Sequence, residues 1–187
     1  MFRKFYSIRQ SFGFRWRGFW VKVRLQSFGC KVGVNLKCWG YVRFRSIPKG
    51  NITIGDNVTL GRDVTLEITE EGSLVIGNHV HIADNVLISG SGPISFGDWG
   101  AVAENVSIRS SFHEMGKDLP YRKQGNKSAP IIFGKDIGIG ANCSVLMGSA
   151  ISDGAFIGSS SLVTSRDEIK PYSIYGGNPL HFIKERK

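Results

Sequence analysis

The sequence predicts an all-β fold, a parallel β-helix, and three observations favour this fold class. An aliphatic residue or Phe recurs every six residues over most of the chain from Ile54 onward. The chain holds 24 Gly but only 6 Pro, and the glycines fall at regular spacings. Because 3.6 does not divide six and the intervening positions are polar, the period is not that of a helix. It suits short strands joined by tight turns, and the 187 residues are within the range of a single domain.

The first 27 residues form a basic and aromatic segment that we expect to be helical. Gly13 and Gly18 weaken this helix, but its apolar side chains share one face at helical spacing: Phe5, Ile8, Phe12, Trp16, Phe19 and Val23. Residues 1 to 55 hold 12 of the 24 Lys and Arg of the chain and none of its 15 Asp and Glu. Two interpretations stay open: the segment lies on an anionic membrane surface, or its aromatic face packs on the end of the domain as a cap.

Other interpretations of the basic segment are disfavoured. Arg or Lys interrupts every apolar run, so we expect neither a secretory signal nor a membrane span. No nucleic-acid-binding motif is legible, so we expect no nucleic-acid partner. The three cysteines, Cys30, Cys38 and Cys143, form no CxxC pair, which favours reduced thiols in a cytoplasmic protein over a disulfide framework or a zinc knuckle.

The six-residue repeat builds the rest of the chain in order. Hexads begin at Ile54, resume at Ile76 and Phe96 after interruptions, and keep one phase over residues 133 to 169, after an irregular piece at residues 114 to 132. Three hexads close one triangular coil, in which the first residue points to the axis and Gly, Asn or Asp takes the corner. A small or β-branched residue fills the fifth position: Val58, Val64, Val80, Val86, Val106, Cys143 and Ala155. Stacked coils bury these residues against one another.

The hexads, the interruption at residues 114 to 132 and the closing "YGGNPLHFIKER" resemble the hexapeptide-repeat acyltransferases, most of all the bacterial surface-polysaccharide O-acetyltransferases, with galactoside and maltose acetyltransferases as relatives. The resemblance covers residues 28 to 184. It implies a left-handed β-helix over residues 28 to 175, a C-terminal tail over residues 176 to 187 and a homotrimer. It also implies acetyl-CoA in the groove between subunits, a sugar or glycan acceptor that is lipid-linked in some members, and no required metal.

By this resemblance, His113 is the catalytic residue. The family's catalytic histidine ends a hexad where the long loop leaves, and His113 alone among the four histidines has that place. A neutral imidazole suits removal of a proton from a sugar hydroxyl at neutral pH. Glu114 is a candidate to orient the imidazole, and Phe112 and Met115 make the loop mouth more apolar than in most relatives.

The resemblance also implies binding residues. Asn85 matches a position at which the galactoside enzymes hold the acceptor sugar, although Asn is also an ordinary corner residue; the acid that relatives place a little further on is replaced by "SGSG" at residues 89 to 92. Backbone groups of the last coils hold the pantetheine of acetyl-CoA, and basic residues near the C-terminus hold its phosphates. The matching positions are Gly140, Ala141, Ser159 and Ser160 for the pantetheine, and Arg166, Lys170, His181 and Lys184 for the phosphates.

Several alternatives remain. His79 and His81 raise the possibility of a zinc enzyme similar to the gamma-class carbonic anhydrases, which would recruit His81 and His113 but lacks a third histidine at the required spacing. A non-catalytic scaffold on the same fold is another. The alternative reaction is N-acetylation of a nucleotide-linked amino sugar. We expect an O-acetyltransferase that is cytoplasmic or peripheral at the inner face of the cytoplasmic membrane.

Overall fold

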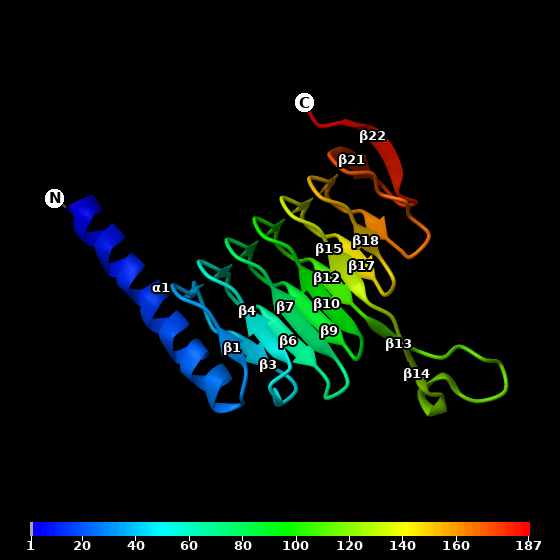
Figure 1. Ribbon diagram of the computed structural model, residues 1–187, viewed down its shortest axis with the longest axis horizontal. Helices are drawn as coiled ribbons and strands as arrows, with labels where there is room; N and C mark the ends of the chain where they lie inside the picture. Colours follow the sequence, from blue (N-terminus) through cyan, green and yellow to red (C-terminus); the bar gives the residue numbers. More distant parts are fainter. Residues whose placement is uncertain (1) are drawn as a thin grey trace.

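The computed structural model describes residues 2 to 187, and their side chains from residue 13 onward. One long helix, α1 (Phe2–Ser27), is followed by a β-helix of six complete three-strand coils (Figure 1). The strands of the successive coils are β1 (Lys31–Val32), β2 (Lys37–Cys38), β3 (Arg43–Phe44), β4 (Ile52–Ile54), β5 (Thr59–Leu60), β6 (Thr65–Ile68), β7 (Ser73–Ile76), β8 (His81–Ile82), β9 (Leu87–Gly90), β10 (Pro93–Phe96), β11 (Ala101–Val102), β12 (Ser107–Arg109), β15 (Ile131–Phe133), β16 (Gly138–Ile139), β17 (Ser144–Leu146), β18 (Ala150–Ile151), β19 (Phe156–Ile157) and β20 (Leu162–Val163).

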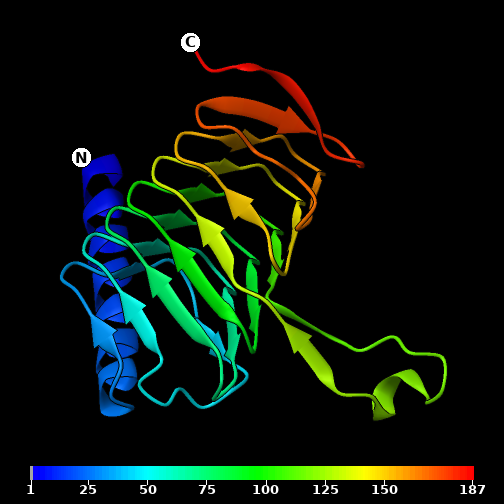
Figure 2. The ribbon, with the colours of Figure 1, turned by 45° about the vertical axis from the view of Figure 1, so that its right-hand side comes forward.

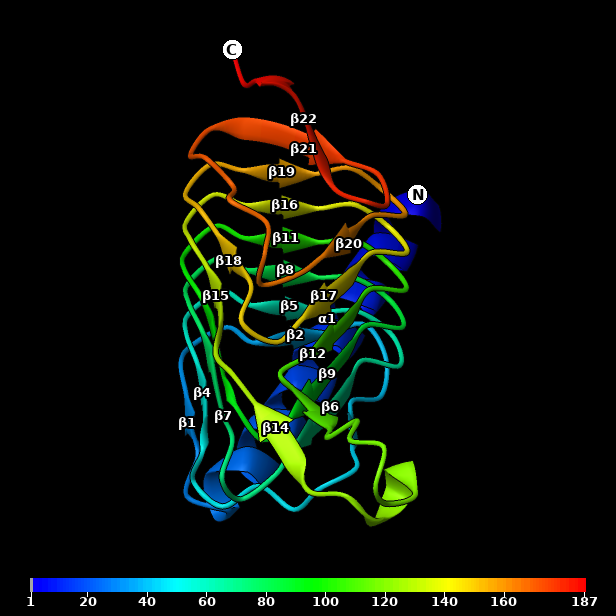
Figure 3. The same ribbon diagram turned by 90° about the vertical axis from the view of Figure 1, so that its right-hand side faces the viewer.

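The coils stack into three parallel sheets, which form the sides of a triangular prism (Figure 3). We call them face A (β1-β4-β7-β10-β15-β18), face B (β2-β5-β8-β11-β16-β19, extended by β21 and β22) and face C (β3-β6-β9-β12-β17-β20). The path from A to B to C winds to the left as the chain climbs the prism (Figure 3). This confirms the predicted left-handed parallel β-helix, although crossovers between parallel strands are right-handed in most proteins.

The hexad rule describes the core of this β-helix. The fifth-position residues named above are all buried, as are the first residues of the hexads, such as Ile54, Ile76 and Phe133. In nine hexads the fourth position turns the corner with a positive φ between 53° and 64°: Asn57, Asp63, His79, Asn85, Trp99, Asn105, Asp136, Asn142 and Ser160. Asn and Asp adopt this conformation at low cost, which explains their recurrence at the corners.

Helix α1 closes the N-terminal end of the prism, but not through the predicted aromatic face. Leu25 is fully buried, and Gly18 lies so close to the Leu36 carbonyl oxygen that a Cβ there would collide with it. Two basic side chains also hold the helix: the Arg17 Nε donates to the Cys38 carbonyl oxygen (3.1 Å), and the Lys22 Nζ donates to the Gly33 carbonyl oxygen (2.8 Å). The helix is therefore a cap, and the glycine expected to weaken it allows the close contact.

The predicted packing face is wrong where side chains are described, because Trp16, Phe19 and Val23 are 53%, 52% and 38% exposed. The prediction for Phe5, Ile8 and Phe12 lies outside the described side chains. No helix of the described chain combines the length and apolar character needed to cross a membrane. The helix thus places an aromatic face on the outside of the molecule.

The irregular piece leaves the prism as an arm after β12 (Figures 1 and 2). It begins three residues earlier than expected, because β13 (Ser111–His113) pairs antiparallel with β14 (Asn126–Ser128), with the short 3-10 helix η1 (Tyr121–Lys123) between them. At the other end of the prism, β22 (His181–Glu185) turns back and pairs antiparallel with β21 (Ser173–Gly176). Residues 181 to 185 of the expected C-terminal tail therefore form a strand of face B.

Candidate active site

His113 lies where the arm leaves the prism. The corner before it is held by Ser110, whose fully buried hydroxyl donates to the Gly92 carbonyl oxygen (2.9 Å) and accepts from the Gly92 N–H (3.1 Å). His113 then pairs with Asn126 across the two strands of the arm, and its ring meets the edge of the Tyr121 ring at a centroid distance of 5.0 Å. The imidazole is therefore positioned on one side by the coil that precedes the arm (β10 to β12) and on the other side by the arm itself.

One ring nitrogen of His113 has no partner in the part of the chain that the structure describes. The Nδ1 atom is buried and makes no hydrogen bond to any of the described residues. A buried polar atom without a partner costs about 1–3 kcal/mol, so such atoms are usually explained by a ligand, water or a chemical role. His113 is half-buried and its Nδ1 atom is not used by the described residues. The imidazole can therefore accept a proton from a bound ligand or donate one to it.

His113 lines a polar pocket of about 420 Å³, which fits a small polyhydroxylated ligand. Its lining combines a carboxylate, a guanidinium, several hydroxyls and the imidazole: Glu67, Thr69, Ser89, Gly90, Ser91, Arg109, Ser111, Phe112, His113, Tyr121 and Asn126. The sequence identified His113 and Phe112 among these, but not Glu67, Arg109 or Tyr121. Whether these three side chains reach the His113 pocket depends on the register between coils. The interruptions in the repeat make that register impossible to derive from the sequence.

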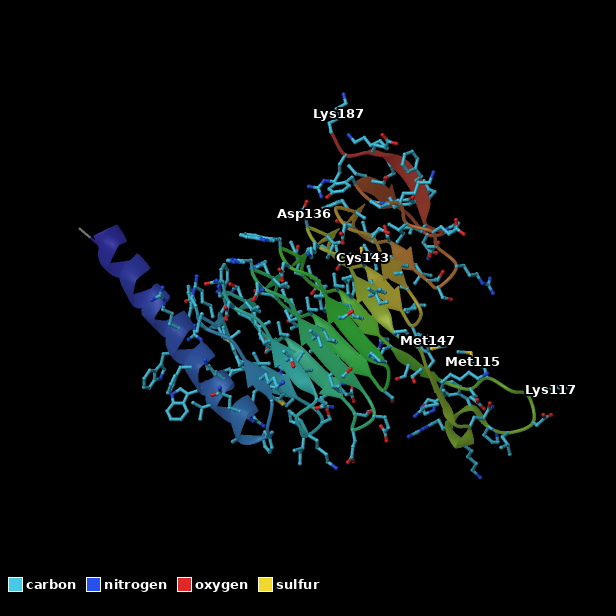
Figure 4. The ribbon with its side chains drawn as sticks, viewed as in Figure 1. Met115, Lys117, Asp136, Cys143, Met147 and Lys187 are labelled. Atoms are coloured by element: carbon cyan, nitrogen blue, oxygen red, sulfur yellow. The ribbon has the colours of Figure 1, made fainter. Side chains whose placement is uncertain are left out.

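The neighbours of His113 have different places from those expected. Glu114 does not orient the imidazole, because its exposed Oε1 points to the Lys127 Nζ at 3.9 Å, while its backbone N–H donates to the Gly125 carbonyl oxygen (2.7 Å). Met115 is 75% exposed and lies outside the pocket lining. Figure 4 shows Met115 and Lys117 on the arm and Met147 close to its base. Of the two apolar neighbours, only Phe112 shapes the pocket.

Asn85 lies on a different corner from His113. It turns the chain between β8 and β9 with a φ of 59°, and its N–H donates to the Arg62 carbonyl oxygen (2.8 Å). It lines a second pocket of about 380 Å³, whose other residues are Trp39, Gly61, His81, Ala83, Asp84, Glu104 and Asn105. Within one chain, the structure therefore does not bring Asn85 into the His113 pocket.

The expected cofactor residues fall in three places. The first group, Gly140, Ala141, Ser159 and Ser160, stacks on the face B to face C corner, where the Ser160 N–H donates to the Ala141 carbonyl oxygen (2.8 Å). Arg166 and Lys170 follow β20, on the same corner column as the base of the arm. Lys184 lies on β22 opposite Ile174. The pantetheine and phosphate positions of one chain thus lie on two corners and on one face of the prism.

His81 and the cysteines are also apart from His113. His81 lies on face B with its ring 6.2 Å from that of Trp39, and the described residues contain no group of three or more His, Cys, Asp and Glu placed to hold a metal ion. The cysteines are free and buried. Burial raises the pKa of the Cys38 thiol to about 12 and also raises that of Cys143. Both therefore remain protonated thiols at neutral pH.

The fold and the pocket together define a class: a left-handed hexapeptide-repeat β-helix with a histidine at the mouth of an inserted arm. No family model matches the chain. A probable acetyltransferase of Mycobacterium tuberculosis is 31% identical over 175 residues, which are 81% of this chain and 57% of that protein. This chain therefore spans a little over half the length of that relative.

Two Escherichia coli proteins are similar over more of their length. A dTDP-4-amino-4,6-dideoxy-D-glucose acyltransferase is 28% identical, with 88% of this chain and 87% of that protein covered. A putative lipopolysaccharide biosynthesis O-acetyl transferase of strain K12 is 26% identical, with 73% and 72% covered. Among solved structures, a variant of AntD, an N-acyltransferase from Bacillus cereus in complex with dTDP and coenzyme A, superposes with a TM-score of 0.73 at 26% identity and covers 89% of each chain. The chain is thus similar in sequence and fold to acetyltransferases and acyltransferases.

Proposed function

We propose that this chain transfers an acetyl group from acetyl-CoA to a hydroxyl group of a sugar in a bacterial surface polysaccharide, such as O-antigen, capsule or exopolysaccharide. The observation that carries the proposal is His113, with a free, buried Nδ1 in a polar pocket at the base of the arm. A sugar hydroxyl is a weak nucleophile, and a neutral imidazole is suited to take its proton as it attacks.

The chemistry is a two-step acyl transfer. As the hydroxyl oxygen bonds to the thioester carbonyl carbon, its proton passes to His113, and the carbonyl oxygen gains negative charge. Backbone N–H groups near the arm steady this oxyanion. The carbon–sulfur bond then breaks, the thiolate of CoA leaves, and the imidazolium returns the proton to it. The products are the O-acetyl sugar and free CoA, so thiol release reports each turnover.

Acetyl-CoA is proposed to lie along the last coils. Backbone groups of Gly140, Ala141, Ser159 and Ser160 would pair with its pantetheine amides, and Arg166, Lys170 and Lys184 with its phosphates. Because these residues occupy two corners and one face of the prism, and Asn85 lies apart from His113, a second copy of the chain is needed to complete both sites. This requirement supports a homotrimer with a site at each interface, and an acceptor role for Asn85 in the neighbouring chain.

A second candidate reaction is N-acylation of a nucleotide-linked amino sugar. It is favoured by the likeness to the dTDP-amino-sugar acyltransferase and to AntD. An amine is already nucleophilic and needs less help from a base. The reaction would use the same acyl-CoA and the same pocket, so the acceptor decides between the two.

We also propose that the outer face of α1 contacts the anionic inner surface of the cytoplasmic membrane, where lipid-linked acceptors lie. The rings of Trp16, Phe19 and Trp20 contact one another at centroid distances of 5.7 to 6.1 Å, and each residue is more than half exposed. Residues 1 to 55 carry no acid, so this end of the molecule complements a negative surface. Aromatic rings favour the headgroup region, and each basic group near it adds about 1 kcal/mol of attraction.

An acceptor screen tests the proposed reaction. Purified protein would be given acetyl-CoA with neutral sugars, glycan fragments and nucleotide-linked amino sugars, and thiol release would be read for the wild type and for His113→Ala. The matched control is His79→Asn, because His79 is a corner residue stacked on Trp99 whose φ of 57° suits Asn. His113-dependent thiol release with a hydroxyl acceptor supports O-acetylation. Release only with the amino sugars supports the second reaction.

A further inference from the structure

We infer that Glu67 binds the acceptor in the His113 pocket by accepting a hydrogen bond from a sugar hydroxyl at its Oε1 atom. This inference rests on the proposed function, because it names the part of the acceptor that the same pocket recognises. Glu67 brings a carboxylate into the lining of this pocket, beside Ser89, Gly90 and Ser91.

Glu67 is part of a row of side chains that leads to the arm. On face C, Glu67 of β6 is in register with Ser89 of β9, and Ser89 is in register with Arg109 of β12. Leu66 and Ile68 on either side of Glu67 are buried in the core, so the alternation of the strand turns Glu67 outward. All three members of the row line the pocket with His113.

The two oxygens of Glu67 have different surroundings. The Ser89 hydroxyl donates to Oε2 (3.1 Å), and the Arg45 Nη1 lies 3.9 Å from the same oxygen. No hydrogen bond or ion pair joins Oε1 to any of the described residues, and the side chain is 37% exposed. One oxygen is thus anchored and the other is left for a ligand. A carboxylate held in this way is pre-oriented, which lowers the entropic cost of binding.

The charges around Glu67 favour hydroxyl groups over an ammonium group. An ionised carboxylate only accepts hydrogen bonds, and sugar hydroxyls supply donors. Arg109 in the row and Arg45 beside Glu67 place two guanidinium groups around one carboxylate, so the positive charge here exceeds the negative charge. The Arg109 Nε donates to the Ser107 hydroxyl (3.2 Å), and its terminal nitrogens make no hydrogen bond within the described chain. They are donors for sugar oxygens, so the row suits a neutral polyol.

Direct sugar binding tests this inference without requiring turnover. Saturation-transfer NMR and titration would use the methyl glycosides of glucose, galactose and rhamnose, with methyl glucosaminide as the amine probe. The proteins are the wild type, Glu67→Ala, Glu67→Gln and the control Glu70→Gln, whose carboxylate pairs with Lys49 outside the pocket. Thermal unfolding and the Kd for acetyl-CoA serve as checks of the fold and of the cofactor site.

The expected result is that at least one neutral glycoside binds and that Glu67→Ala raises its Kd roughly 10- to 100-fold, as for a lost hydrogen bond to a charged group. Glu67→Gln should raise it less, and Glu70→Gln should leave it unchanged. The inference is overturned if no neutral glycoside binds, if Glu67→Ala binds like the wild type, or if methyl glucosaminide binds more tightly than the neutral sugars. Glu67-dependent sugar binding without thiol release would instead defeat the proposed reaction alone.

Discussion

Replacement of Ser110 by Ala tests how the β-helix holds His113, the proposed general base. The Ser110 hydroxyl is fully buried and makes two hydrogen bonds to Gly92, one to its carbonyl oxygen and one from its N–H. Ser110→Ala removes both bonds and leaves both backbone groups buried without a partner. Each such group costs about 1–3 kcal/mol, so the free energy of unfolding should fall by about 2–6 kcal/mol.

The same change should reduce turnover, because His113 lies three residues further along the chain, directly after the loosened corner. A displacement of about 1 Å at a catalytic group can cost on the order of 10²-fold in rate. We therefore expect kcat to fall about 10- to 100-fold while the KM for acetyl-CoA stays close to that of the wild type.

The assay is urea unfolding at one fixed protein concentration, with kcat from thiol release measured on the same samples. The matched control is Ser95→Ala, because Ser95 faces outward on face A and its hydroxyl bonds to none of the described residues. Ser95→Ala should change the free energy of unfolding by less than about 0.5 kcal/mol. If Ser110→Ala unfolds at the same urea concentration as the control, the argument that this hydroxyl anchors the arm is refuted.

Three further predictions concern the rest of the chain. Gly13→Ala should stabilise the protein by up to about 1 kcal/mol in urea unfolding, because a Cβ at this helical position would make only an ordinary contact with the Arg17 side chain. Gly18→Ala should destabilise it, because a Cβ there collides with the first coil; the same sign for both would contradict the packing of α1. The paired change Phe19→Ser and Trp20→Ser should weaken sedimentation with anionic vesicles and leave thermal unfolding nearly unchanged, so undiminished vesicle binding would remove the membrane proposal. Burial raises the pKa of the Cys38 thiol from 9.0 to about 12, so the folded state holds this proton more tightly than the unfolded state does. The free energy of unfolding should therefore fall as the pH rises from 9 towards 12, and Cys38→Ala should lose this part of the pH dependence when unfolding is measured across that range.

The repeating part of the fold could be predicted from the sequence because each hexad position has one physical task. The first and fifth positions fill the core, and the fourth adopts a positive φ, so their residue types recur visibly. The first coil keeps the six-residue spacing, from Val32 of β1 to Cys38 of β2 and Phe44 of β3, but Trp39 and Tyr41 stand where later hexads carry Gly and a corner Asn or Asp, so the repeat is plain only from Ile54. The packing face of α1 was missed because it relies on Gly18 and on the hydrogen bonds of Arg17 and Lys22, none of which an apolar periodicity detects.

Of the candidate site too, one part could be predicted from the sequence and another part could not. His113 could be identified because it ends a hexad at the irregular piece, and this place can be recognised from the order of residues along the chain alone. Glu67 and Arg109 could not, because they reach the pocket through pairing between coils that are separated by interruptions of unequal length. Glu114 was misplaced because adjacent residues of a strand point to opposite sides. Sequence order therefore predicts the residue at the arm, and only the register between coils reveals the rest of the pocket.

The central claim is that His113 removes the proton from the acceptor hydroxyl. Its most direct test is the rate of thiol release from acetyl-CoA with a hydroxyl-bearing sugar, for the wild type, His113→Ala and His79→Asn. The account predicts a fall in kcat of roughly 10² to 10⁴ for His113→Ala, with unchanged thermal unfolding, and a rate close to wild type for His79→Asn. Near-normal turnover by folded His113→Ala would contradict the account.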